Sequence, residues 1–356
     1  MEMKVLFDHQ IFYQIIGGAS KYFAMMINSL PKGCWETTTL LSCNTYVRSL
    51  HLFEHSFPYV FRGQPRVLDL LNKPYTRYVL GRQDYDVFHQ TNFGTYCLES
   101  IGNKPMVTTF HDANFLRNDP HPELVKRQKA SLHRADMIIC VSENTRKDML
   151  SFFDVDEKKT RVVYHGIDIP DLQALPDNRL VKDDYILYVG RRHRYKNFRR
   201  FIEAYAVIKS KYPELKLVCT GDKFTSEESL LMSKLGVIDD VRLVRADETE
   251  MKQLYRDAVF FIFPSLYEGF GMPILEAWSC NCPVLLSDAS CFPEIAGNAG
   301  LYFQPDSVDD MVDKMERALS NENLRRNLVE LGRSRVKMFS WKRCADEHFA
   351  IYNSLL

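Results

Sequence analysis

The sequence predicts an α/β protein built from two doubly wound parallel sheets. Strand-like apolar segments alternate with amphipathic helical segments along the whole chain, which is typical of parallel sheets. The length of 356 residues favours two domains rather than one. A polar, proline-containing segment without clear periodicity, residues 169–184, divides the pattern into two similar halves and is expected to be the linker.

Twelve strands are expected, and amphipathic helices fall between them. The first half supplies strands at Val5–Phe7, 37–43, 86–90, 105–111, 136–142 and 161–167. The second half supplies 185–190, 215–221, 240–246, 259–265, 282–288 and 300–305. One predicted helix starts after Asn197, a good N-cap, and carries an apolar stripe of Phe198, Phe201, Ile202, Tyr205 and Ile208. Ligands of open parallel sheets bind at the carboxyl ends of strands, so the site is expected in the loops there.

The composition limits the class of protein. Basic and acidic residues number 46 each, so the net charge is zero and no general nucleic-acid-binding surface is indicated. No apolar run is long enough to span a membrane, and the first 20 residues do not resemble a signal peptide. The nine cysteines are scattered, and the one close pair, Cys280 and Cys282, lacks zinc-site spacing. A reduced, cytosolic protein with buried thiols is therefore expected.

The stretch YEGFGMPILEA, from Tyr267 to Ala277, follows the predicted buried strand 259–265. Gly269 and Gly271 permit a sharp turn, and Pro273 suits the first position of a helix. The free N–H groups at a helix start favour an anion. This stretch therefore predicts a strand, a glycine-rich loop and a helix start that can bind a phosphate.

Two carboxylates flank this predicted anion site. Glu268 is expected in the loop and Glu276 in the first helical turn. Carboxylates accept hydrogen bonds from hydroxyls, so a nucleotide sugar, with phosphates in the middle and hydroxyls at both ends, suits the whole stretch. The alternative is structural: Glu276 complements the helix dipole and Glu268 is a solvated loop acid.

A basic loop, GRRHRYKN (190–197), follows strand 185–190 in the same half. Arg191 and Lys196 can converge there on one anion and neutralise a diphosphate without a metal. The alternative is a solvated basic surface loop.

The first half offers weaker candidates at its strand ends. Gly17 and Gly18 in GGASKYF can let the backbone approach a ligand or simply form a tight turn. No G-x-G-x-x-G fingerprint follows the first strand, which argues against a standard dinucleotide dehydrogenase. His111, in TTFHDAN, can hydrogen-bond a sugar hydroxyl or cap a loop. VSENTRKDML (141–150) is expected to be a strand, a cap at Ser142 or Asn144, and a helix.

Two further features carry alternatives. The D-x-D pairs Asp84/Asp86 and Asp154/Asp156 lie in polar contexts and are interpreted as solvated charges rather than metal ligands. Residues 62–82 contain five Arg/Lys and one Asp interleaved with apolar residues. They are either a surface for anionic lipid and lipid-linked acceptors or a solvated helix pair broken at Pro74.

Taken together, PSLYEGFGMPILEA, VGRRHRYKN, FHD and VSENTRKDML resemble the retaining glycosyltransferases of family 4, over nearly the whole chain and in the family's order. The resemblance implies the GT-B fold, in which two Rossmann-like domains face a central cleft. Residues 1–168 would form the acceptor domain, 169–184 the linker and 185–339 the nucleotide-sugar domain, while 340–356 would form a helix that crosses back to the first domain. GGASKYF is similar to the head of bacterial polysaccharide enzymes, many of them mannosyltransferases, with Lys21 in place of the usual Arg. The segment TGDKF (220–224) lacks the family's second glycine.

The resemblance also implies roles for single residues. Glu268 would bind the donor sugar and Glu276 the ribose, while Arg191 and Lys196 would hold the diphosphate. The backbone amides of Phe270, Gly271 and Met272 would bind sugar and phosphate. His111 would lie near the reacting face of the sugar. Gly17 and Gly18 would close over the phosphates. Glu268, His111, Arg191 and Lys196 are thus the candidate catalytic residues, and no general base is assigned.

The expected reaction is the retaining, metal-independent transfer of a hexose to a glycan or lipid-linked acceptor in surface polysaccharide biosynthesis. The donor would be GDP-mannose or a UDP-sugar, and no cofactor or nucleic-acid partner is expected. The expected location is the cytoplasm, with peripheral contact to the inner face of the cytoplasmic membrane as one alternative. Three other functions stay open: a glycoside phosphorylase of the same fold, a non-catalytic nucleotide-sugar-binding module and a metal-dependent transferase that uses the D-x-D pairs.

Overall fold

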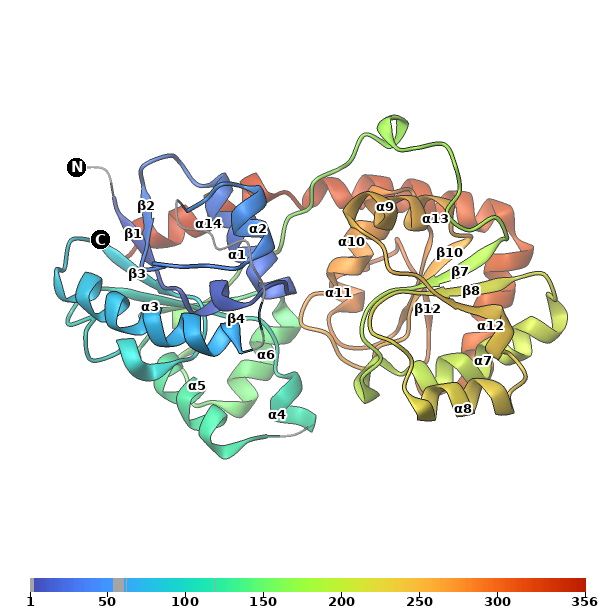
Figure 1. Cartoon of the computed structure of the whole chain (residues 1–356), viewed down its shortest axis with the longest axis horizontal. Coiled ribbons are helices and arrows are strands. Elements are labelled where there is room, and N and C mark those ends of the chain that lie inside the picture. Colours follow the sequence, from blue (N-terminus) through green and yellow to red (C-terminus); the bar gives the residue numbers. More distant parts are fainter. Residues whose placement is uncertain (1–2, 54–60, 62, 119) are drawn as a thin grey trace. The chain divides into compact units, whose positions relative to one another are not determined.

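A computed structural model describes residues 3–53, 61, 63–118 and 120–356 of the chain. The chain forms two compact units, which are treated separately. Unit 1 comprises Met1–Gly166 and Ser340–Leu356, and unit 2 comprises Ile167–Phe339. Each unit contains a six-stranded, fully parallel sheet flanked by helices (Figure 1). The predicted fold class, two doubly wound parallel sheets, is therefore confirmed.

The sheet of unit 1 has the order β2-β1-β3-β4-β5-β6. Its strands are β1 (Val5–Phe7), β2 (Trp35–Thr37), β3 (Val87–Gln90), β4 (Met106–Phe110), β5 (Met137–Cys140) and β6 (Thr160–Val162). Its helices are α1 (Gly18–Ser29), α2 (Thr45–Ser49), α3 (Gln64–Gly81), α4 (Asn114–Asn118), α5 (Pro122–Arg134), α6 (Glu143–Phe152) and α14 (Trp341–Asn353), with a 3-10 turn, η1, at Gln10–Tyr13.

The sheet of unit 2 has the order β12-β11-β10-β7-β8-β9. Its strands are β7 (Tyr185–Tyr188), β8 (Lys216–Cys219), β9 (Val241–Leu243), β10 (Phe260–Phe263), β11 (Val284–Ser287) and β12 (Leu301–Phe303). Its helices are α7 (Phe198–Lys211), α8 (Ser226–Lys234), α9 (Glu248–Asp257), α10 (Met272–Ser279), α11 (Phe292–Ala296), α12 (Val308–Ser320) and α13 (Glu322–Arg335).

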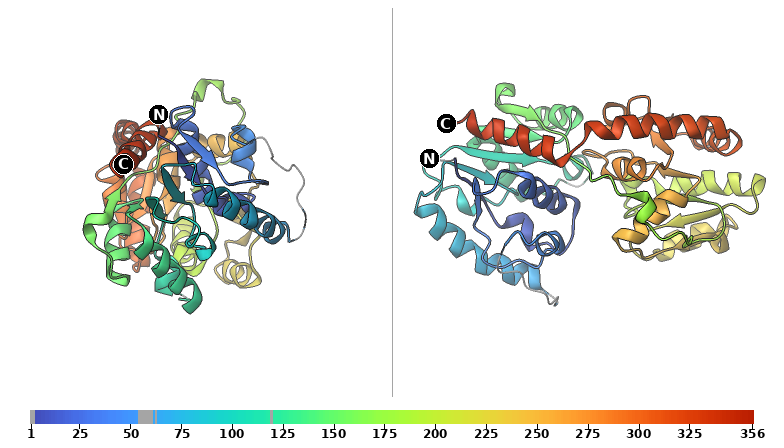
Figure 2. Two further views of the ribbon diagram at one scale, coloured as in Figure 1. Left: turned by 90° about the vertical axis from the view of Figure 1, so that its left-hand side faces the viewer. Right: turned by 90° about the horizontal axis from the view of Figure 1, so that it is seen from above.

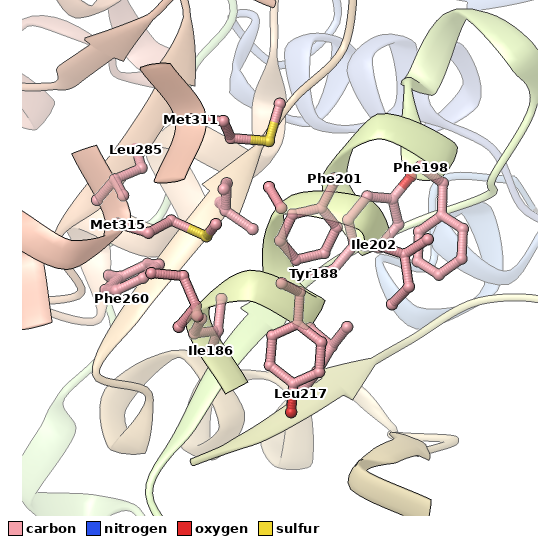
Figure 3. Packing of buried hydrophobic residues seen from close by; sticks show 14 of the residues in the cluster. Ile186, Tyr188, Phe198, Phe201, Ile202, Leu217, Phe260, Leu285, Met311 and Met315 are labelled. Carbon is pink, nitrogen blue, oxygen red and sulfur yellow. The ribbon is translucent and has the colours of Figure 1, made fainter. Parts of the chain in front are cut away.

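The core of unit 2 is apolar, as its strand sequences predict. The predicted stripe of α7 packs against strands and against α12, and Figure 3 shows Phe201 and Ile202 in the same buried cluster as Met311 of α12. Each fully buried aliphatic or aromatic side chain contributes about 1.5–3 kcal/mol by leaving water. This buried apolar cluster holds the loops that follow β7 and β10 on a rigid base.

The core of unit 1 contains polar groups that the sequence does not reveal as buried. The C-terminal helix α14, red in Figure 2, lies against α1 of the same unit. His348 Nδ1 donates to the Cys344 carbonyl at 2.7 Å. The other ring nitrogen, Nε2, is therefore the acceptor, and the Tyr22 hydroxyl donates to it at 2.8 Å. The Tyr352 hydroxyl oxygen lies 2.6 Å from His89 Nδ1. Hydrogen bonds as well as apolar contacts therefore attach the chain's last helix to the sheet.

One predicted strand is wrong in most of its length. Segment 37–43 leaves the sheet after Thr37, and β2 is Trp35–Thr37 instead. The backbone N–H groups of Leu40 and Leu41 donate to Asn72 Oδ1 of α3, at 2.7 and 3.1 Å, rather than to a neighbouring strand. A distant side chain thus takes the hydrogen bonds that a strand would have used.

Helix details also depart from expectation in two places. Asn197 precedes α7 in a left-handed conformation (φ +56°), not in the extended one of an N-cap, and its side chain makes no cap. Its Nδ2 donates to the Pro305 carbonyl at 2.7 Å, and its Oδ1 accepts from Arg200 Nη1 at 3.2 Å. The alternative of a helix pair broken at Pro74 is wrong, because α3 runs unbroken from Gln64 to Gly81. Buried Asn72 and Thr76, on either side of Pro74, are hydrogen-bonded to the rest of the unit and hold both halves of the helix in line. Ser142 caps α6, as predicted.

Candidate functional sites

The loop between β10 and α10 ends at Gly271, which lies in the left-handed region at φ +90°. A Cβ there would come within 3.1 Å of Ile274 and Phe292, so both the backbone and the packing require glycine. The helix begins at Met272, one residue before Pro273. Its first N–H groups have no partner within the helix, which is the arrangement that favours an anion.

Glu268 and Lys196 come together from two separate loops of unit 2. Lys196 Nζ lies 2.5 Å from Glu268 Oε1, and the two side chains are 16% and 15% exposed. The Glu268 backbone is held by Ser290, whose Oγ donates to the Glu268 carbonyl at 2.7 Å and accepts from its N–H at 3.2 Å. This partly buried ion pair therefore has a fixed position at the carboxyl end of the sheet.

Glu276 lies in the second turn of α10, not in the first as the sequence predicted, because the helix begins at Met272. Its Oε2 accepts a hydrogen bond from the Tyr255 hydroxyl at 3.2 Å. Burial, and then the charge of Glu276, raise the pKa of Tyr255 well above its usual value. The tyrosine therefore stays protonated at neutral pH and orients the carboxylate. No pattern in the sequence points to Tyr255 as this partner.

The two neighbouring arginines of the basic loop differ in their environments. Arg191 is 71% exposed and lies 3.5 Å from Asp222 Oδ2. Arg192 is only 3% exposed, lies 3.1 Å from Glu228 Oε1 and stacks on the ring of Phe224 at 4.5 Å. Arg192 thus supports the loop, whereas Arg191 presents its guanidinium to solvent, where an anionic ligand can reach it.

Phe270 and Met272 flank Gly271 at the helix start. Phe270 is buried, and its ring centroid lies 6.0 Å from that of Phe339 in the same unit. The Phe270 side chain therefore anchors the loop, while the backbone of this segment supplies the amides that the sequence analysis assigned to sugar and phosphate.

His111 follows β4 in unit 1. Its ring contacts Tyr22 and Phe23, with centroid distances of 5.1 and 5.7 Å. Burial, with a smaller effect of His348, lowers the pKa of His111 to about 4. The histidine is therefore neutral near pH 7. Its Nε2 is buried and has no hydrogen-bond partner among the described residues.

Gly17 and Gly18 lie at the N-terminus of α1, as expected for a loop that leads into a helix. A Cβ on Gly18 would meet nothing within 4 Å, whereas one on Gly17 would come within 2.8 Å of the Gln14 side chain. Packing inside unit 1 therefore places no strong demand on Gly18.

Unit 1 also contains a cavity of about 620 Å³ at the carboxyl ends of β1, β3 and β4. Thr109 and His111 line it, together with residues from η1, the loop after β3, α3 and α5. Of this lining, the sequence pointed to His111 as a site residue, and it offered segment 62–82, which contains Asp69 and Lys73, as a surface for lipid-linked acceptors. The rule that ligands bind after parallel strands would have pointed to Thr91–Tyr96, but nothing in the sequence points to α5.

Three aspartates of the two D-x-D pairs make contacts within unit 1: Asp84, Asp86 and Asp156. Asp86 accepts from the Lys4 N–H at 2.7 Å, and Asp84 lies 3.5 Å from Lys4 Nζ. Asp156 caps a short 3-10 turn. Within the described part of the chain, no group of three or more His, Cys, Asp or Glu side chains could hold a metal ion. All nine cysteines are buried and unbridged.

Comparison with known proteins identifies the family. The profile described as "Glycosyl transferases group 1" matches residues 175–335, and "Glycosyltransferase Family 4" matches 16–170. An Escherichia coli protein named O-antigen chain mannosyltransferase B is 30% identical over 77% of this chain and 75% of its own length. The chain belongs to the family 4 glycosyltransferases. Salmonella typhimurium O-antigen chain mannosyltransferase RfbU is 29% identical over 59% of this chain and 63% of its own length.

Solved structures share the fold of this glycosyltransferase. Sucrose-phosphate synthase from Thermosynechococcus elongatus matches with a TM-score of 0.77 and 20% identity over 99% of both chains. Anabaena HepE, solved with UDP and glucose, matches with a TM-score of 0.80 and 16% identity over 99% of this chain and 100% of its own. At these identities the likeness establishes the two-domain fold alone.

Proposed function

We propose that this glycosyltransferase transfers a hexose, with retention of configuration, from a nucleoside-diphosphate sugar to a glycan or lipid-linked acceptor in surface polysaccharide biosynthesis. Relatives named as O-antigen mannosyltransferases make GDP-mannose the first donor to test, with a UDP-sugar as the second. The observation that carries the proposal is the Lys196–Glu268 pair beside the start of α10.

The pair supports a division of labour in unit 2. When the donor diphosphate binds, Lys196 turns from the carboxylate to the phosphates, with the exposed Arg191 as the second cation. Glu268 then accepts hydrogen bonds from the transferred sugar. Glu276, oriented by Tyr255, binds the ribose hydroxyls. Phe270, Gly271 and Met272 supply amides to the sugar and phosphate.

The chemistry follows from these charges. The bond from C1 to the phosphate oxygen breaks, and its electron pair stays on the diphosphate, so the sugar gains oxocarbenium character. Lys196, Arg191 and the α10 amides stabilise the departing charge. The acceptor oxygen bonds C1 on the same face, and its proton passes to the departing phosphate, so no protein base is assigned. The role of His111 at the reacting face and the contact of Gly17 and Gly18 with the phosphates stay predictions from the family resemblance.

A thermal-shift panel of nucleoside diphosphates and their sugars tests donor binding, because a ligand that binds the native state raises its apparent stability. We expect one nucleoside diphosphate and its sugar to raise the melting temperature, and the same sugar nucleotide to be consumed when a glycan acceptor is added. Binding without consumption would favour a non-catalytic module. Consumption of free phosphate would indicate a glycoside phosphorylase.

We also propose that α3 contacts the inner face of the cytoplasmic membrane. Its exposed face presents Val67, Leu70, Leu71 and Tyr78, with Arg82 at its end. An apolar face with cations at its border suits an anionic lipid surface. Arg62, part of the basic segment at 62–82, lies outside the described residues. No helix within those residues is long and apolar enough to span a bilayer.

Vesicle co-sedimentation tests this contact. The protein should bind anionic vesicles at low salt, and the Leu70→Ser and Leu71→Ser double variant should bind less. Leu230→Ser serves as the control, because Leu230 is an exposed leucine of unit 2 whose exposed fraction lies between those of Leu70 and Leu71. Equal binding to neutral and anionic vesicles would contradict the proposal.

A further inference from the structure

Gln128 is the most deeply buried polar side chain that α5 contributes to the cavity of unit 1. It is 5% exposed, and its Oε1 has no hydrogen-bond partner among the described residues. His111 Nε2, from the loop after β4, is in the same condition in the lining of the same cavity. A buried polar atom without a hydrogen bond lowers stability. Two such atoms in one cavity indicate a ligand that carries hydrogen-bonding groups.

The charges of the lining argue against an anionic ligand. Its carboxylates are Asp69, Asp112 and Glu123, and its cations are Lys73 and Arg127. Both cations already have carboxylate partners: Lys73 lies 2.6 Å from Asp69, and Arg127 lies 3.2 Å from Glu123. A phosphate would have to displace these partners and would then lie beside three carboxylates. An uncharged ligand requires neither change.

The remaining lining suits a sugar ring. Four partly exposed aromatic side chains can cover the apolar C–H faces of such a ring: Tyr13, Phe93, Tyr96 and Phe115. Polar groups lie between them, and a cavity of about 620 Å³ falls in the range of small-molecule sites. Aromatic surface combined with a few fixed polar atoms is the usual composition of such sites.

We propose that this cavity binds the uncharged terminal sugar of the acceptor, and that Gln128 selects it by accepting a hydrogen bond from a ring hydroxyl. This inference rests on the proposed function and adds the chemical class of the acceptor and a residue that determines specificity. Gln128 holds the sugar and takes no part in bond breaking. His111 Nε2 provides the second polar contact of the same sugar.

Binding without any donor tests the inference. Octyl glycosides of mannose, glucose, galactose and N-acetylglucosamine, and their 6-phosphate counterparts, are titrated against the full chain by ligand-observed NMR. We expect at least one neutral glycoside to bind more tightly than its phosphate. Gln128→Met, of similar shape but without the amide, should weaken that binding about 3- to 10-fold, the effect of one lost hydrogen bond. Gln128→Glu keeps an accepting oxygen and should retain most of the affinity.

Ser131→Ala is the matched control, since Ser131 lies on the same helix and its buried Oγ also has no partner among the described residues, but it is outside the lining. It should leave glycoside binding unchanged. The melting temperature of Gln128→Met without glycoside should equal or exceed that of the wild type, because the change removes an unpaired buried amide oxygen. If Gln128 only stabilises the fold, Gln128→Met should instead lower the melting temperature.

Three results would overturn the inference: no neutral glycoside binds, the phosphates bind more tightly, or Gln128→Met binds the sugar as the wild type does. The proposed function fails separately. If the wild type binds a neutral glycoside but transfers no sugar to it from any nucleotide sugar, the reaction is wrong while the binding result stands. If transfer occurs and Gln128→Met leaves the KM for the glycoside unchanged, only the role of Gln128 is wrong.

Discussion

The two units have the same type of sheet but very different interiors. Unit 2 buries an apolar cluster, and the polar residues buried with it are uncharged Ser, Thr, Asn and Gln, while the buried guanidinium of Arg192 lies in a loop. Unit 1 buries titratable groups within its core, among them Asp8, His89, His165 and His348. In unit 2 the charged groups that matter lie on loops above an inert core. In unit 1 the polar groups extend into the core and shape a cavity, so its chemistry and its stability depend on the same residues.

The largest expected effect is on the loop chemistry of unit 2. Glu268→Gln removes the carboxylate that faces the sugar as C1 gains positive charge. It should lower kcat by roughly 100-fold, equivalent to about 2.7 kcal/mol of transition-state stabilisation. Nucleoside diphosphate affinity should not fall, because that ligand lacks the sugar. Glu203→Gln, a surface acid of the same unit that pairs with Arg199, should leave kcat unchanged. Equal losses in both variants would contradict the role of Glu268.

The polar core of unit 1 should make that unit sensitive to acid. Burial lowers the pKa of His111 and of His348 from 6.5 to about 4. The two histidines favour the folded state fully above pH 6.5. This stabilisation is lost as the pH falls from 6.5 toward 4, because in that range the histidines bind protons in the unfolded state but not in the folded state. Each should reduce the unfolding free energy by about 1.4 kcal/mol per pH unit near pH 5.

Denaturant unfolding of unit 1 between pH 7 and pH 5 measures this loss. His111→Asn should flatten the pH dependence, whereas His193→Asn, which alters an exposed histidine of unit 2, should not. A stability that is constant down to pH 5 would show that these histidines are not buried in their neutral form.

The ribose contact should give a smaller effect. Glu276 binds a part of the donor that does not react, so its hydrogen bonds are similar in the ground and transition states. Glu276→Gln should raise the donor KM about tenfold and change kcat less. Tyr255→Phe, which removes the hydroxyl that orients Glu276, should raise KM in the same direction by less. Steady-state kinetics over donor concentration separates these parameters, and a kcat loss larger than the KM rise would assign Glu276 to the reacting sugar instead.

The smallest expected effect is that of a chelator. Lys196 and Arg191 supply the positive charge at the diphosphate, so activity in excess EDTA should stay within about twofold. A tenfold loss that Mg²⁺ or Mn²⁺ restores would show that these two side chains are not sufficient. The same assay on Lys196→Met, with and without Mg²⁺, would show whether a cation in solution can replace the lysine.

Prediction from the sequence succeeded where the signal is local. The apolar runs placed all the strands except most of 37–43, and the Gly-rich stretch before Pro273 gave the loop and helix start that hold Glu268. It failed where a distant side chain decides the backbone. Asn72 Oδ1 accepts from the N–H groups of Leu40 and Leu41, and Asn197, in a left-handed conformation, donates its Nδ2 to the Pro305 carbonyl and makes no cap for α7. No window of the sequence contains both partners of these contacts.

The sequence by itself determined the fold class, the family and the glycine-rich loop that carries Glu268. Hydrophobic periodicity and loop motifs are local patterns, each contained within a few neighbouring residues. Only the tertiary structure decided which charges pair and which polar groups are buried. It brought Lys196 to Glu268 and Tyr255 to Glu276, and it placed Gln128 and His111 in the lining of one cavity. These side chains come from separate strands and helices, so their chemistry depends on how parallel strands end at one edge of a sheet, which spacing along the chain does not encode.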